Sequence, residues 1–328
     1  MQEKATGRRV SFVVPVFNEV DTLEELTRRI HEEADALPQG VVAGHDIVFV
    51  DDGSTDGSSD SLERLFRSDP RVTVLRFRKN FGKAAALRAG FERATGDVVF
   101  TLDADLQDDP AEIGSFLATL DGGFDLVSGW KARRHDPLSK TLPSKLFNFV
   151  VSRSTGLELH DFNCGFKCMR REVAKSVALY GEMHRFVPAL AHAKGFRVGE
   201  IKVRHHPRRF GRSKYGIGRL PKGLCDFLSV MVITRHARTA LHAFGAIGLL
   251  VAAGGAALGT VLLTSWLSGD DEAERLLVWL SIVLGVSGLH IVLFGLLADL
   301  LSRHTTRGRS DDAMVAGFLA HGAREESA

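Results

Sequence analysis

The chain has 328 residues, a formal net charge of +2 and 45% hydrophobic residues, so it is long enough for more than one domain. Its three cysteines, Cys164, Cys168 and Cys225, exclude a fully paired disulfide framework and lack the spacing of a zinc site, so we expect reduced thiols in a cytosolic compartment. The apolar run near the N-terminus is interrupted at Pro15 and followed by acids, which is wrong for a signal peptide.

Apolar runs and helical segments alternate along the first part of the chain. Strands are predicted at residues 8–17, 45–52, 72–77 and 97–105, and helices at residues 22–37, 58–66 and 83–94. This alternation predicts an α/β fold with a mostly parallel sheet covered by helices on both faces. Ligands bind such sheets beyond the carboxyl ends of the strands, and three of these ends carry acidic or polar groups, so we expect them to converge.

The C-terminal third has a different composition. Residues 239–267 and 276–298 contain no Asp, Glu, Lys or Arg, and each run exceeds the roughly 20 residues that span a bilayer. Basic residues flank the pair on its outer sides, and an acidic segment, "SGDDEAER", lies between them. We therefore expect a transmembrane hairpin over 239–303, with spans at about 239–267 and 276–299 and both ends in the cytoplasm.

The rest of the chain divides around that hairpin. We expect a cytosolic domain over 1–218, amphipathic helices lying in the membrane interface over 219–238 and a cytosolic tail over 304–328. Between Lys202 and Arg238 there are ten Lys and Arg against one acid, Asp226. Such a segment beside a membrane either attracts anionic lipid headgroups in general or binds one lipid phosphate, and both readings stay open.

The segment "TLDADLQDDP" places Asp103 and Asp105 directly after a predicted strand. Two carboxylates in this arrangement suit one hard cation, Mg²⁺ or Mn²⁺, that bridges to a nucleotide diphosphate. The alternative is an acidic turn on a solvated surface. Asp108 and Asp109, next to Pro110, are interpreted as helix N-terminal residues without a catalytic role.

Other polar positions allow two interpretations each. Asp52 and Glu19 could bind a base or ribose hydroxyl, whereas residues 51–54 could also be a tight turn made for local reasons. Asp161 and Asn163 could orient a substrate or cap a turn, and the roles of His184 and Arg185 are equally open. No dinucleotide fingerprint follows the first strand, and Ile217 stands where a phosphate loop needs Lys, so neither a Rossmann oxidoreductase nor a P-loop NTPase is supported.

The motifs "VVPVFNE", "VDDGSTDGS", "NFGKAAALRAGF", "GDVVFTLDADLQDDP" and "SGW", in this order, resemble a family 2 glycosyltransferase of the GT-A fold. "HRFVPALA", "HHPRRFGRSKYG" and the two C-terminal spans are similar to the polyprenyl-phosphate glycosyltransferases, the group that includes dolichol-phosphate mannose synthase. The resemblance covers essentially the whole chain.

The resemblance implies roles for named residues. The nucleoside pocket would be lined by Pro15, Phe17, Glu19, Val50 and Asp52. The metal, the diphosphate and the sugar would be held by Asp103, Ala104, Asp105 and Gln107, of which Asp103, Asp105 and Gln107 would be metal ligands and catalytic residues. The acceptor phosphate would contact Arg208, Arg209, Arg212, Ser213 and Lys214. Lys131 would face the donor, where relatives carry Arg; Arg133 or Arg134 could substitute for it.

The resemblance also implies an activity. The chain would move a sugar from a nucleotide sugar to a polyprenyl phosphate, with inversion, at the cytoplasmic face of the inner membrane. A phosphate monoester is largely dianionic at pH 7, so it can attack without a carboxylate base. The resemblance also implies a homo-oligomer, a tetramer, and no nucleic-acid partner. The alternatives are a processive polysaccharide synthase, whose "QxxRW" motif is missing here, and a non-catalytic membrane scaffold.

Overall fold

The computed structural model describes residues 7–132, 148, 151–153, 155–181, 183–206, 240–268, 275–304 and 315–319. The chain divides into two compact units. The sheet unit comprises residues 1–230 and 310–328, and the hairpin unit comprises residues 231–309. The interfacial helices expected at 219–238 lie outside the described residues.

The sheet unit is built on one mixed sheet, with the described strands in the order β7-β5-β6-β4-β1-β2-β3-β8. Its strands are β1 (Arg8–Val16), β2 (Val42–Asp51), β3 (Val72–Phe77), β4 (Val98–Thr101), β5 (Leu126–Trp130), β6 (Lys167–Arg170), β7 (Val198–Lys202) and β8 (Val315–Leu319). Neighbouring strands among β1 to β4 pair in parallel, as do β5 and β7. β6 runs antiparallel to both β4 and β5, and β8 runs antiparallel to β3. The predicted α/β class with a mostly parallel sheet is confirmed.

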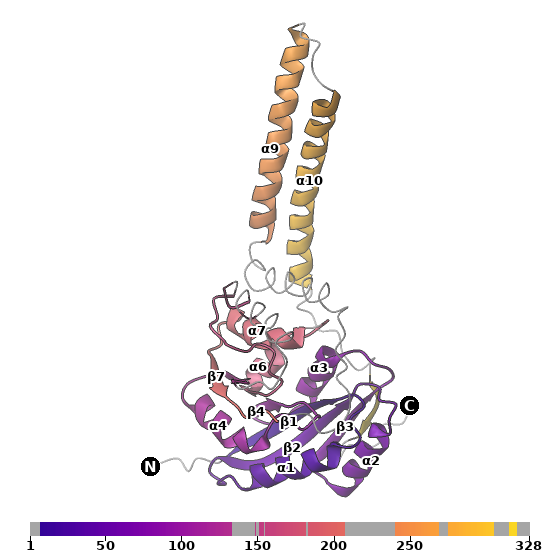
Figure 1. Ribbon diagram of the computed structural model, residues 1–328, viewed down its shortest axis with the longest axis vertical. Coiled ribbons are helices and arrows are strands. Elements are labelled where there is room, and N and C mark those ends of the chain that lie inside the picture. The colour runs from indigo at the N-terminus through magenta and orange to yellow at the C-terminus, as the bar shows by residue number, and fades with distance from the viewer. Residues whose placement is uncertain are drawn as a thin grey trace. The chain divides into compact units, whose positions relative to one another are not determined.

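Helices cover both faces of this sheet. They are α1 (Leu23–Asp35), α2 (Ser58–Ser68), α3 (Lys83–Arg93), α4 (Ile113–Asp121), α6 (Arg171–Ser176) and α7 (Val187–Ala193), with short 3-10 turns η1 (Pro110–Glu112) and η2 (Met183–Phe186). Figure 1 shows α1, α2 and α4 on one side of the sheet and α3, α6 and α7 on the other.

Alternation along β1 supplies the core on both faces. Phe12 is fully buried and stacks on Phe100 of β4 with ring centroids 5.2 Å apart, in the cluster that includes the inner side chains of α1 and α4. Val13 faces the opposite way, toward α3. At that contact Gly90 lets the helix approach closely, because a Cβ there would overlap the Val13 side chain.

The order of the strands reverses at β1, which makes a topological switch point between β1 and β4. The connection from β1 through α1 leads to β2 on one side, whereas the connection from β3 through α3 returns to β4 on the other side of β1. The carboxyl ends of these strands lie at the same edge of the sheet, with Val13 opposite Thr101 and Val16 opposite Asp51. Open α/β sheets bind their ligands at such a point.

The hairpin unit contains two long apolar helices, α9 (Ala240–Leu267) and α10 (Arg275–His304). The segments Phe244–Leu267 and Arg275–Leu297 have mean hydropathies of 2.1 and 2.3 and are long and apolar enough to cross a membrane. Their backbones approach closely where glycines meet: a Cβ on Gly288 would lie 2.6 Å from the carbonyl oxygen of Gly248. Small residues at such contacts are typical of helices that pack in lipid.

Candidate functional site

The loop after β4 carries the first of the expected acids, Asp103. Its side chain is 29% exposed and forms an ion pair with Lys83, the first residue of α3. Burial alone would raise the pKa of this carboxyl, but the ammonium groups of Lys83 and Lys131 outweigh burial and hold the pKa of Asp103 below its usual range. Asp103 is therefore ionised and already faces positive charge.

Asp105 lies deeper in the same loop and is 8% exposed. Its carboxylate accepts a hydrogen bond from the backbone N–H of Gln107 at 3.2 Å. Between them, Leu106 has φ of +60°, a left-handed conformation that is uncommon for a residue with a side chain. Strained backbone of this kind clusters at functional sites, where surrounding contacts hold it in place.

The loop that carries Asp103, Asp105 and Asp108 is called the acidic loop. Gln107 in this loop forms hydrogen bonds to the end of the segment after β7. Its side-chain amide donates to the carbonyl oxygen of His206 at 3.2 Å, and the His206 N–H donates to the carbonyl oxygen of Gln107 at 2.9 Å. His206 Nε2 also lies 3.1 Å from Asp109 Oδ2. The expected phosphate-binding residues 208–214 lie outside the described residues, but the chain that leads into them is attached directly to the acidic loop.

Asp108 and Asp109 have different environments. Asp109 caps η1, accepting from the N–H of Ala111 at 3.2 Å, as its position before Pro110 predicted. The same interpretation is wrong for Asp108, because the turn begins one residue later and the Asp108 side chain points inward. It is 1% exposed, and Oδ1 lies 3.1 Å from Lys131 Nζ. This contact is an ion pair without hydrogen-bond geometry, and neither carboxylate oxygen accepts a hydrogen bond from the described residues.

Lys131 is thus placed against the acidic loop. Its side chain is 15% exposed. Burial alone would lower the pKa of this ammonium, but the nearby carboxylates, chiefly Asp108, raise it above its ordinary value. Lys131, which was expected beside the donor, therefore contacts Asp108 and also interacts electrostatically with Asp103.

The expected nucleoside residues lie at the ends of β1 and β2. Pro15 pairs with Val50 in the ladder, and Val50 is fully buried, so its side chain belongs to the core and its backbone is what a ligand could reach. The loop after β1, which holds Phe17 and Glu19, is hydrogen-bonded to the start of α2, because the Glu19 N–H donates to Ser58 Oγ at 3.0 Å. Of the two alternatives for residues 51–54, the structure shows the tight turn, and contact with a nucleoside stays a prediction.

Asp51 makes the tight turn. Its carboxylate accepts from the N–H of Ser54 at 2.9 Å. Gly53 has φ of +71°, and a Cβ there would lie 2.5 Å from the carbonyl carbon of Lys79, so this turn requires glycine. Asp52, 4% exposed, accepts from the backbone N–H groups of Phe81 at 2.6 Å and Gly82 at 2.9 Å, at the start of α3.

The burial of Asp52 has an electrostatic consequence. Burial raises the pKa of this carboxyl to about 6, in spite of the two backbone hydrogen bonds that favour its ionised form.

Direct contacts also join the loops at the strand ends. Thr22 Oγ1 donates to the carbonyl oxygen of Ala104 at 2.6 Å, and the Asn18 N–H donates to Ser54 Oγ at 3.0 Å. The three strand ends that the sequence placed together are therefore in contact.

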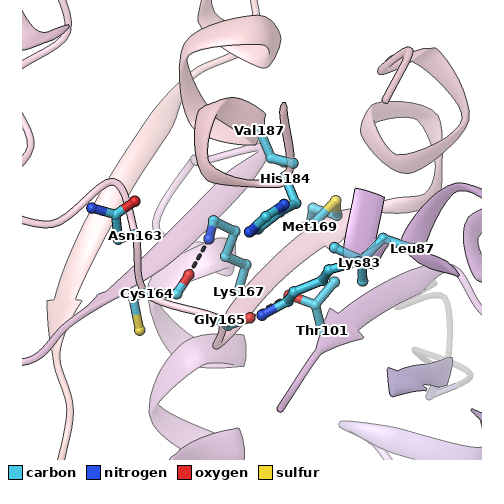
Figure 2. Close-up of a pocket in the computed structure, with 10 residues that line it drawn as sticks. All are labelled: Lys83, Leu87, Thr101, Asn163, Cys164, Gly165, Lys167, Met169, His184 and Val187. Carbon is cyan, nitrogen blue, oxygen red and sulfur yellow. Dashed lines mark hydrogen bonds between the residues drawn. The ribbon is translucent and has the colours of Figure 1, made fainter. Parts of the chain in front are cut away.

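A small pocket of about 10 Å³, room for about one water molecule, adjoins Asp103 (Figure 2). It is lined by Lys83, Leu87, Thr101, Asn163, Cys164, Gly165, Lys167, Met169, His184 and Val187. The backbone of Gly165 lies against the acidic loop, since a Cβ on this residue would be 2.6 Å from Asp103 Oδ2. Burial raises the pKa of the Cys164 thiol to about 12, so this cysteine stays protonated.

Sequence reasoning missed two lysines of this pocket. Lys83 follows Gly82 in the "NFGK" motif. The signal that could have identified it is a basic residue at the start of a helix, in a fold whose neighbouring strand ends are acidic. Lys167 lies in β6, which pairs with β4 only through long-range contacts, and no local signal identified it. Asn163 and His184, whose roles were left open, both line the pocket, whereas Asp161 accepts from the N–H of Asn163 at 3.0 Å and so stabilises a turn.

The donor atoms fit a divalent cation. Asp103 and Asp105 offer two carboxylates, and the Gln107 amide oxygen comes from the same loop. No cluster of three or more His, Cys, Asp or Glu forms a metal site among the residues that the structure describes. One or two carboxylates completed by water and substrate phosphates is the set that Mg²⁺ prefers.

Comparison with known proteins gives one family. The family model described as "Glycosyl transferase family 2" matches residues 11–178. The chain is 35% identical over 314 residues to dodecaprenyl-phosphate galacturonate synthase of Rhizobium johnstonii, across 93% of this chain and 90% of that protein. It is 31% identical over 306 residues to undecaprenyl-phosphate 4-deoxy-4-formamido-L-arabinose transferase of Salmonella choleraesuis, across 92% of this chain and 91% of that protein.

A solved structure shares the fold. The crystal structure of glucosyl-3-phosphoglycerate synthase from Mycobacterium tuberculosis, in complex with Mn²⁺ and UDP-glucose, superposes with a TM-score of 0.51. It is 18% identical in sequence and covers 70% of this chain and 79% of that chain. The expected arrangement of the sheet domain is confirmed by this likeness.

Proposed function

Because the chain belongs to glycosyl transferase family 2, we propose that it transfers one sugar, with inversion, from a nucleotide sugar to a polyprenyl phosphate at a membrane. Both relatives are named as enzymes that work on polyprenyl phosphates, and the chain aligns with about nine-tenths of each. Their sugars differ, so the identity of the donor has to come from the site itself.

One observation supports this function best. The acidic loop at the switch point is hydrogen-bonded through Gln107 to His206, from which the chain continues into the basic segment. A site for a nucleoside diphosphate and a site for a lipid phosphate would therefore adjoin. The two membrane-length helices then supply the reason for a lipid acceptor.

The residues divide the work as follows. Asp103, Asp105 and Gln107 would hold Mg²⁺ or Mn²⁺, and the bound cation would stabilise negative charge on the diphosphate leaving group as a Lewis acid. Phe17, Glu19 and Asp52, with the backbone of Pro15, Val50 and Ala104, would hold the nucleoside end of the donor. Lys131 would keep the acidic loop in shape through Asp108.

The acceptor needs no carboxylate base. A lipid phosphate is largely dianionic at pH 7. One of its oxygens forms the bond to the anomeric carbon while the bond from that carbon to the diphosphate breaks. Arg208, Arg209, Arg212, Ser213 and Lys214 would position this phosphate, and Arg can do so with two parallel hydrogen bonds. We place the chain in the inner membrane with the sheet unit in the cytoplasm.

The test uses the full chain in membranes or detergent, with undecaprenyl phosphate and a panel of radiolabelled UDP- and GDP-sugars. We expect one lipid product of the mass of a polyprenyl-phosphate monosaccharide. Asp105→Asn should lower its rate of formation about 100-fold or more. Asp121→Asn is the matched control, since Asp121 lies at the end of α4 and pairs on the surface with Arg8 at 2.7 Å. Polymer formation would favour a processive synthase, and the absence of product from every donor would overturn the proposal.

A further inference from the structure

Lys83 covers the first of the expected metal ligands. Its ammonium group forms an ion pair with Oδ1 of Asp103. The other oxygen of this carboxylate, Oδ2, lies against the backbone of Gly165, where a Cβ would come within 2.6 Å of it. Figure 2 shows the Lys83 side chain extending from α3 toward Gly165. A cation that approached Asp103 in this arrangement would therefore meet the ammonium group of Lys83.

The ammonium group and a divalent cation exclude each other at this carboxylate. Bound to the same group they would lie about 4 Å apart, and a single and a double positive charge at that distance repel, even in water, by the equivalent of about 30-fold in affinity. A protein site screens charge less than water does, so the repulsion there is larger. A cation held by Asp103 hence requires Lys83 to leave.

The exposure of this ion pair allows it to open. The side chains of Lys83 and Asp103 are 26% and 29% exposed, and ion pairs that reach solvent contribute little to stability. The pair of Asp108 and Lys131 differs, because its side chains are only 1% and 15% exposed and breaking a buried pair is costly. Of these two lysines, Lys83 is therefore the one that can move.

The backbone that carries Lys83 is fixed between the two ends of the expected donor site. Asp52 accepts hydrogen bonds from the N–H groups of Phe81 at 2.6 Å and Gly82 at 2.9 Å, which attaches the start of α3 to the end of β2, where the nucleoside would lie. The Lys83 side chain reaches the acidic loop, where the diphosphate would lie. A released ammonium group thus stays beside the diphosphate, whose oxygens accept charge-assisted hydrogen bonds.

We propose that Lys83 occupies the metal site of the resting enzyme and moves to the donor diphosphate when the cation and the nucleotide bind. This inference rests on the proposed function. Each ligand then binds weakly alone: the cation has to displace the ammonium group, and the nucleotide lacks that group as a partner while it stays on Asp103. Together they replace one ion pair by two, so each strengthens the binding of the other by the same factor.

Binding of Mn²⁺ tests this inference without any transfer reaction. The full chain in detergent is titrated with Mn²⁺, and the free ion is measured by its electron paramagnetic resonance signal. Lys83→Met should bind Mn²⁺ alone about 10-fold more tightly than the unsubstituted chain, because the competing charge is gone. Lys83→Gln, which keeps a polar group without the charge, should show the same gain. A residue that only stabilised the loop would not strengthen metal binding when it is removed.

The same variant should bind the nucleotide more weakly. With saturating Mn²⁺, UDP or GDP should bind Lys83→Met about 10-fold less tightly, because a charge-assisted hydrogen bond to phosphate is lost. Without Mn²⁺ the nucleotide affinity should change little, since Lys83 then stays on Asp103. The coupling between cation and nucleotide should therefore fall about 10-fold. Lys175→Met is the matched control, because Lys175 lies in α6 and donates to the backbone carbonyl of Glu92 at 2.7 Å.

The outcomes separate this inference from the function on which it rests. Affinity for Mn²⁺ that is unchanged or weaker in Lys83→Met overturns the inference, and so does unchanged coupling to the nucleotide. In an Asp103→Asn background the gain from Lys83→Met should vanish, because the two cations compete only at that carboxylate; a gain that persists also overturns the inference. Each of these results leaves sugar transfer in place. Failure of the proposed function is seen separately, as absence of lipid product from every donor, and the inference falls with it.

Discussion

At the scale of single residues, lysines hold the acidic loop from two sides. Lys83 comes from α3 and Lys131 from the end of β5, and they pair with Asp103 and Asp108. In the second pair Asp108 is buried and Lys131 is only 15% exposed, so the Asp108 carboxylate depends on the Lys131 charge. Removing one partner of a buried ion pair is costly, whereas removing both is often nearly neutral.

Lys131→Met should therefore destabilise the full chain by about 3 kcal/mol, because it leaves the Asp108 carboxylate buried without a counter-charge. In a unit of this size that corresponds to a fall in Tm of roughly 6–12 °C. Thermal unfolding in detergent measures it. The double variant Asp108→Asn with Lys131→Met should recover most of the loss; an additive double variant would show that the two side chains do not interact.

Gly165 tests how closely the acidic loop must be placed. A Cβ at this position would come within 2.6 Å of Asp103 Oδ2, so Gly165→Ala must displace the carboxylate. A shift of about 1 Å at reacting groups can cost roughly 100-fold in rate, so we expect kcat to fall by 10- to 100-fold with Tm nearly unchanged. Gly44→Ala is the control, because a Cβ there meets nothing within 4 Å. Equal activity of the two variants would contradict the proposed role of Asp103.

At the scale of elements, a polar cluster joins α1 to β2 at the edge of the sheet opposite the site. His45 is buried, and its Nε2 lies 2.7 Å from Nδ1 of His31. The other ring nitrogen of His31, Nε2, lies 2.8 Å from Asp69 Oδ2. Asp35 and Arg71 complete the surroundings. Burial lowers the pKa of His45 to about 4, and electrostatic repulsion from His31 lowers it further in the same direction.

The unfolded chain binds a proton at His45 near pH 6.5, whereas the folded chain resists it until about pH 4. Stability is therefore complete above pH 6.5 and falls as the pH drops through this window, by on the order of 3 kcal/mol. Denaturant unfolding at pH 7 and pH 5 should show about 2 kcal/mol of this loss, because pH 5 lies inside the window. His45→Phe should reduce the dependence on pH, and an unchanged slope in this variant would assign it to other groups.

The elements that sequence predicted best are those with local causes. α1 buries Leu23, Leu26, Ile30 and Ala34, as their helical spacing indicated, and β3 runs over the six apolar-rich residues foreseen for it. β6 was not foreseen, because "KCMR" has no alternation, and its antiparallel place between β4 and β5 depends on long-range pairing. The acidic loop could be predicted because its aspartates form a local pattern in the sequence. The pocket lined by Lys167 could not, because it depends on the long-range pairing of β6.

At the scale of the whole molecule, the chain returns to the same sheet after the two apolar helices. β7 precedes the two apolar helices, β8 follows them, and both strands belong to the same sheet. A chain that leaves this sheet unit through one membrane span must therefore come back through another. The basic outer flanks of the two helices are the pattern on which we base the proposal that the sheet unit lies in the cytoplasm.

Cysteine labelling tests this topology in intact cells. Ser268→Cys, at the end of α9, should react with a membrane-impermeant maleimide added outside, because it would lie between the two spans. Ser302→Cys, in the last turn of α10, should react only after the membrane is opened. The background replaces Cys225 by Ser, and the buried Cys164 and Cys168 serve as internal unreactive controls. Labelling of both introduced cysteines from the same side would mean that the helices do not cross the bilayer, and a lipid acceptor would then need a different route to the site.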